Sequence, residues 1–104
     1  MTSIDIGALD DFETGTPRQL RVGGRTLVAI RIDETVYVLD DRCSHEEFSL
    51  SEGEVDVENA EIECARHGAM FRLSDGAAMT LPATKPVGRY DVQNNNGRLE
   101  VSLP

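Results

Sequence analysis

The sequence of 104 residues contains no tryptophan, and aromatic residues make up only 5% of it. Branched aliphatic side chains must therefore fill most of the interior, and such side chains favour strands over helices. No stretch is long and apolar enough to span a bilayer. The N-terminus, MTSIDIGALDDF, also lacks the basic start and apolar run of a signal peptide. We expect one domain, residues 1–104, in a cytoplasmic protein.

Basic residues are scarce too, because ten lysines and arginines stand against 19 acidic residues, for a net charge of −9. Such a charge repels nucleic acids and anionic membranes, so we expect neither as a partner. Most of the excess lies in residues 40–63, which hold one base, Arg42, and ten acids: Asp40, Asp41, Glu46, Glu47, Glu52, Glu54, Asp56, Glu58, Glu61 and Glu63. This acidic segment is either a solvated hairpin face or a docking surface for a basic partner.

The sequence also lacks the usual equipment of an enzyme. It has two histidines, and both stand beside the two cysteines, so no further histidine is left to act as a general base. It contains no glycine-rich phosphate loop and no flavin or nicotinamide motif. We therefore expect a protein that transforms no substrate itself.

Short apolar runs separated by turn residues are typical of an antiparallel all-β domain. Two turns are well marked, because the Gly23-Gly24 pair and the segment 94–97 (Asn-Asn-Asn-Gly) favour the positive φ angles of tight hairpins. Only Ala8–Phe12 suggests a helical turn. The predicted strands are Ser3–Ile6, Arg18–Val22, Arg25–Ile32, Val36–Leu39, Val55–Val57, Ile62–Glu63, Arg89–Gln93 and Arg98–Leu103, and we expect them to form a barrel or sandwich.

Two loops carry the residues with the most distinctive chemistry. Cys43 and His45 follow one predicted strand, and Cys64 and His67 follow another, with 18 residues between the two pairs. If the loops meet, two thiolates and two imidazoles converge, a ligand set that suits zinc, iron or an iron–sulfur cluster and suits calcium poorly. A disulfide between the cysteines is the remaining alternative, although small disulfide-dependent domains usually carry more cysteines.

The pattern Cys-x-His followed by Cys-x-x-His resembles the Rieske family of [2Fe–2S] proteins. The resemblance implies one cluster, in which Cys43 and Cys64 hold the inner iron while His45 and His67 hold the outer iron. It covers nearly the whole chain and extends to the residues before and after the first loop. Leu81–Pro86 resembles the proline loop that covers the cluster, so the cluster-binding part spans about residues 40–86.

The chain is most similar to the soluble ferredoxins of bacterial ring-hydroxylating dioxygenases. This resemblance implies a carrier that takes single electrons from a flavin-containing NAD(P)H-dependent reductase and passes them to a terminal oxygenase. We expect a monomer, which suits such a shuttle. High-potential Rieske proteins carry an extra cysteine in each loop, which this chain lacks. They also place serine and tyrosine hydroxyls against the cluster, where this chain has Ala69 and Phe71. We therefore predict a reduction potential at the low end of the range, about −150 mV.

Two alternatives stay open at this point. The same four ligands also form closed zinc sites, so a structural or sensing zinc module remains an interpretation of the motif. An accessory ferredoxin that works with iron–sulfur assembly proteins would share the cluster but not the dioxygenase partners.

Overall fold

The computed structural model describes residues 2–43, 48–65, 68–81 and 83–104. These residues form ten strands and two short 3-10 helices, η1 (Leu9–Asp11) and η2 (Leu50–Glu52). Strands β1 (Thr2–Ala8), β10 (Arg98–Leu103) and β9 (Val92–Asn95) make one sheet, in that order. A central sheet has the order β2 (Arg18–Val22), β3 (Arg25–Ile32), β4 (Thr35–Asp40), β8 (Arg89–Tyr90), and a small sheet contains β5 (Val55–Asp56), β6 (Glu61–Glu63) and β7 (Met70–Arg72).

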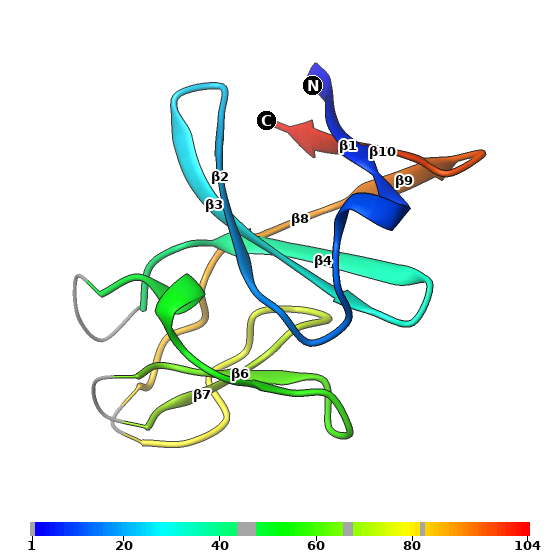
Figure 1. Ribbon diagram of the computed structural model, residues 1–104. Coiled ribbons are helices and arrows are strands. Elements are labelled where there is room, and N and C mark those ends of the chain that lie inside the picture. Colours follow the sequence, from blue (N-terminus) through cyan, green and yellow to red (C-terminus); the bar gives the residue numbers. More distant parts are fainter. Residues whose placement is uncertain (1, 44–47, 66–67, 82) are drawn as a thin grey trace.

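All the pairings between these strands are antiparallel, which confirms the predicted all-β class. In Figure 1 the small sheet lies at one end of the molecule, whereas both termini lie at the other end, beside β1 and β10. No helix within the described ranges is both long and apolar enough to cross a membrane.

The central hairpin forms where the sequence predicted it. Gly23 and Gly24 have φ angles of 57° and 79°, and the flanking residues Val22 and Arg25 pair with each other. Both turn positions thus use the left-handed region, which glycine enters without steric cost. Because the register is fixed there, alternate residues of β3 point to opposite faces of the central sheet.

Both faces of the central sheet are buried. Val28 and Ile30 face a core that also contains the two cysteines, whereas Leu27 and Ala29 face a second core closed by β1 and β10. A strand covered on both sides needs apolar residues without alternation, which explains the continuous run in β3. We call the core that contains Cys43 and Cys64 the cysteine core, and the core closed by β1 and β10 the terminal core.

The fold differs from the sequence prediction in several places, and the bounds of β1, β4, β5 and β6 shift by one or two residues. The predicted strand Arg89–Gln93 is divided at Asp91, since β8 pairs with β4 and β9 pairs with β10. Strand β7 and helix η2 were not predicted. The helical turn expected at Ala8–Phe12 is present as the shorter helix η1.

Candidate metal centre

Two cysteines lie at the ends of strands, where the sequence placed them. Cys43 comes three residues after the end of β4, and Cys64 directly follows β6. Their side chains are 1% and 0% exposed and belong to one buried cluster, the cysteine core. Both cysteines are in the described part of the chain, and no disulfide joins them. The disulfide interpretation is therefore not supported, and two thiols remain for metal binding.

Each of the two cysteine loops is closed by a backbone hydrogen bond of the same type. The N–H of Cys43 donates to the carbonyl of Phe48 at 2.9 Å, and the N–H of Cys64 donates to the carbonyl of Ala69 at 2.7 Å. In each case the acceptor lies five residues after the cysteine. His45 and His67 fall inside these two loops in the sequence, but both lie outside the described residues, as do Arg66 and Pro82.

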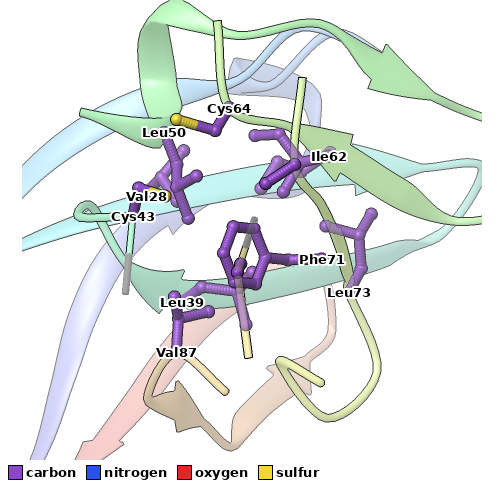
Figure 2. Packing of buried hydrophobic residues seen from close by; sticks show 12 residues of the cluster. Val28, Leu39, Cys43, Leu50, Ile62, Cys64, Phe71, Leu73 and Val87 are labelled. Atoms are coloured by element: carbon purple, nitrogen blue, oxygen red, sulfur yellow. The ribbon is translucent and has the colours of Figure 1, made fainter. Parts of the chain in front are cut away.

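The interior around the cysteines contains no hydroxyl at the two positions singled out from the sequence. Ala69 and Phe71 are both 0% exposed, and both belong to the cysteine core. Figure 2 shows Phe71 among the aliphatic side chains, with both cysteines on one side of this group and Leu73 on the other. These two side chains can donate no hydrogen bond to a sulfur atom.

A buried carboxylate lies just before the first cysteine loop. Asp41 is 5% exposed, and among the described residues it is the only charged side chain in the buried class. Its Oδ2 accepts hydrogen bonds from Gln19 Nε2 at 2.7 Å and from Ser51 Oγ at 2.7 Å, while its Oδ1 accepts from the N–H of Ser51 at 2.6 Å. The sequence pointed to Asp41 only as one member of the acidic segment.

A close backbone contact joins the segment after the first loop to the start of the second. A Cβ atom added to Gly53 would lie 1.7 Å from the carbonyl oxygen of Glu63, the residue before Cys64. Beside this contact, the N–H of Glu63 donates to the carbonyl of Glu54 at 2.8 Å. Only glycine allows so close an approach of the two chain segments.

The residues just before the segment expected to cover the site are hydrogen-bonded to β7, the strand that follows the second loop. Met79 donates its N–H to the carbonyl of Met70 at 2.8 Å, and the N–H of Met70 donates to Thr80 Oγ1 at 2.9 Å. Farther along this segment, Ala83 is buried in the cysteine core, whereas Leu81 is 79% exposed. The segment therefore packs into the cysteine core through Ala83 and presents the apolar side chain of Leu81 to the solvent.

The donor set of the described residues fits an iron–sulfur cluster. Two buried thiols in one core are suitable ligands for the inner iron, and their loops have matched closures. Within the described ranges no three His, Cys, Asp or Glu side chains gather as a metal site. The described residues thus offer two buried cysteine thiols as candidate ligands.

Comparison with known proteins identifies the class. Residues 2–91 match the model of the Rieske [2Fe-2S] domain. The ferredoxin CarAc of Metapseudomonas resinovorans is 34% identical over 100 residues, covering 95% of this chain and 92% of the relative. The anthranilate 1,2-dioxygenase ferredoxin subunit of Burkholderia cepacia is 32% identical, covering 94% and 89%.

Solved structures agree with these relatives. The ferredoxin of carbazole 1,9a-dioxygenase from Nocardioides aromaticivorans IC177 superposes with a TM-score of 0.96, at 32% identity and over 100% of both chains. A structure described as a complex of reduced oxygenase and oxidized ferredoxin in carbazole 1,9a-dioxygenase matches with a TM-score of 0.87 and 34% identity, covering 96% of this chain and 92% of the other.

The fold and the buried cysteines are those of a small iron–sulfur protein, and the chain belongs to the Rieske [2Fe-2S] domain family. It is an electron-transfer ferredoxin that carries one Rieske-type [2Fe–2S] cluster. The comparisons favour this class over a zinc module, and the protein is an electron carrier and not a catalytic enzyme.

Proposed function

We propose that the protein carries single electrons from a flavin-containing NAD(P)H-dependent reductase to the terminal oxygenase of an aromatic-ring-hydroxylating dioxygenase. The observation that carries this proposal is the near full-length similarity to ferredoxins of such systems. The matched structure of an oxygenase with its ferredoxin supports the oxygenase as the acceptor.

We further propose that Cys43 and Cys64 bind the inner iron and that His45 and His67 bind the outer iron. The burial of both cysteines in one core supports their assignment to the inner iron. Each histidine stands in the sequence between a cysteine and the residue that accepts the hydrogen bond of that cysteine, which supports the assignment of the histidines to the outer iron. The cluster accepts and donates one electron at a time. The chain's own contribution is to hold the thiols in an apolar interior from which solvent is excluded.

The surface beside the second loop is suited to short-lived binding of a partner. Leu81 is 79% exposed on a segment that is hydrogen-bonded to β7, and large exposed apolar side chains commonly mark interaction sites. The acidic segment supplies carboxylates that would attract a basic partner and accelerate encounter without tight binding. A carrier needs such weak contacts because it must also dissociate.

Reconstitution tests the proposed function. The purified ferredoxin is mixed with NADH or NADPH and with the reductase and oxygenase encoded near its gene, and the bleaching of the cluster absorbance is followed. Catalytic reduction by the reductase, followed by product formation that depends on the ferredoxin, is the expected result. If the reductase reduces the cluster no faster than NAD(P)H alone, or if product forms equally well without the ferredoxin, the proposal is wrong.

Charge reversal tests the docking role of the acidic segment. A triple variant with lysine at Glu46, Glu47 and Glu52 should slow electron transfer to the partner and weaken its dependence on salt concentration. A control variant reverses three exposed acids remote from the cysteines, Asp10, Glu13 and Glu34, and so changes the net charge equally. Equal effects of the two variants would assign the result to net charge alone and would contradict a local docking surface.

A further inference from the structure

We propose that Asp41 is a positioning residue for the cluster, which holds the loop of Cys43 in register with the segment that leads to Cys64 and keeps a negative charge close to the inner iron. This inference rests on the proposed ligand assignment of the two cysteines. It does not depend on which proteins exchange electrons with the ferredoxin.

The hydrogen bonds of Asp41 span the first cysteine loop. The carboxylate stands two residues before Cys43, and its partner Ser51 belongs to η2, after the loop has returned at Phe48. Gln19 adds a third bond from strand β2 of the same sheet. Because Asp41 contacts both a residue after the loop and strand β2, the loop cannot shift without breaking a partly buried hydrogen bond.

The connection continues to the second cysteine. Gly53, two residues after Ser51, packs against the carbonyl of Glu63. Glu63 is the residue immediately before Cys64 in the chain. The N–H of Glu63 also donates to the carbonyl of Glu54 at 2.8 Å. A continuous series of short contacts thus runs from the residues before Cys43 to the residue before Cys64. Its members set the separation of the two thiols that share the inner iron.

The charge of Asp41 has its own consequence. Both carboxylate oxygens accept hydrogen bonds, and every partner is a donor, which is the arrangement that suits an ionised carboxylate. Cα atoms two residues apart are separated by no more than about 7 Å. Since reduction makes the cluster more negative, a buried negative charge at this range opposes reduction and lowers the potential. At an effective dielectric constant of about 20, one unit charge changes the equilibrium roughly tenfold even from about 12 Å, which leaves room for the side chains and the cluster beyond the two Cα atoms.

Four variants of the holoprotein test the proposal, with cluster release to an iron chelator and the reduction potential as measurements. Asp41→Asn removes the charge and disturbs the hydrogen bonds, and Ser51→Ala removes one hydrogen bond while it keeps the charge. Asp10→Asn, in the exposed helix η1, controls for net charge. Val36→Ala lies in the terminal core and controls for a general loss of stability.

We expect Asp41→Asn to release its cluster about tenfold faster than Val36→Ala. The stabilising free energy of a hydrogen bond to a charged group corresponds to at least about a tenfold change in an equilibrium. Its potential should rise by about 59 mV, the equivalent of a tenfold higher ratio of reduced to oxidised cluster for a one-electron couple. Ser51→Ala should release the cluster faster than the control but keep the potential of the unaltered protein. Both controls should keep the wild-type potential.

The positioning role is overturned if Asp41→Asn, once folded, releases its cluster no faster than Val36→Ala. If Asp41→Asn does not fold, Ser51→Ala decides: faster release supports the role and release at the control rate overturns it. The charge effect is overturned if Asp41→Asn keeps the potential of Asp10→Asn. All these measurements use the isolated ferredoxin, so a failure of the proposed electron-transfer partners would leave their outcome unchanged.

Discussion

The contact between Gly53 and Glu63 gives a quantitative prediction for one methyl group. In Gly53→Ala the new Cβ would lie 1.7 Å from the Glu63 carbonyl oxygen, and real Cβ contacts essentially never fall below 3.0 Å. The two segments must therefore separate by at least 1.3 Å. Metal–ligand distances tolerate changes of only about 0.2 Å. Since Glu63 directly precedes Cys64, we expect this variant to lose most of its cluster.

The comparison with Gly24→Ala makes the result specific to this contact. Gly24 has φ +79° and no atom within 4 Å of an added Cβ, so its alanine variant suffers backbone strain of about 1–2 kcal/mol without any collision. Gly53 shows no such strain, because its φ is −88°. Iron content and visible absorbance per protein are measured for both variants. A Gly53→Ala protein with full iron content and an unchanged spectrum, equal to Gly24→Ala, would refute the reasoning.

Three further predictions concern the cluster and its surroundings. Phe71→Tyr adds a hydroxyl to the cysteine core and should raise the potential above about −150 mV if the hydroxyl reaches a sulfur; a titration showing no rise would contradict this. His67→Cys should lower the potential or lose the cluster, and a retained Rieske spectrum would count against the ligand assignment. Arg72 lowers the pKa of Asp75 to about 2 through a side-chain hydrogen bond, so this carboxylate stabilises the fold above pH 3.8, and the stabilisation disappears as the pH falls towards 2. The difference in unfolding midpoint between the wild type and Asp75→Asn should shrink over that interval, and a constant difference would contradict it.

Strand positions were predictable where local chemistry decides them. The bounds of β2, β3 and β10 agree with the prediction. A pair of turn residues with positive φ marks one end of each strand, Gly23 and Gly24 between β2 and β3, and Asn96 and Gly97 before β10. Strand β7 has only three residues and no alternating pattern, and its pairing with β6 depends on the return of the second loop. The division of the predicted strand at Asp91 could not be predicted either. It arises because β8 pairs with β4 while β9 pairs with β10, and such pairing depends on residues far away in the sequence.

The sequence indicated the candidate ligands, but it did not indicate the buried carboxylate beside them. The spacing of cysteines and histidines indicated a metal, and the burial of Cys43 and Cys64 in one core agrees with it. The sequence grouped Asp41 with surface acids, yet its side chain is 5% exposed. The prediction failed there because the partners that allow its burial, Gln19 and Ser51, lie 22 and 10 residues away along the chain.

The two faces of the central sheet give different properties to neighbouring residues of one strand. Val28 and Leu39 touch the core that holds the cysteines, whereas Leu27 and Val38 touch the core beneath the chain ends. Changes on the second face should alter the melting temperature while the redox behaviour stays the same, because the residues of that core do not pack with the cysteines. Substitutions only one position apart in one strand should therefore separate thermal tolerance from reduction potential.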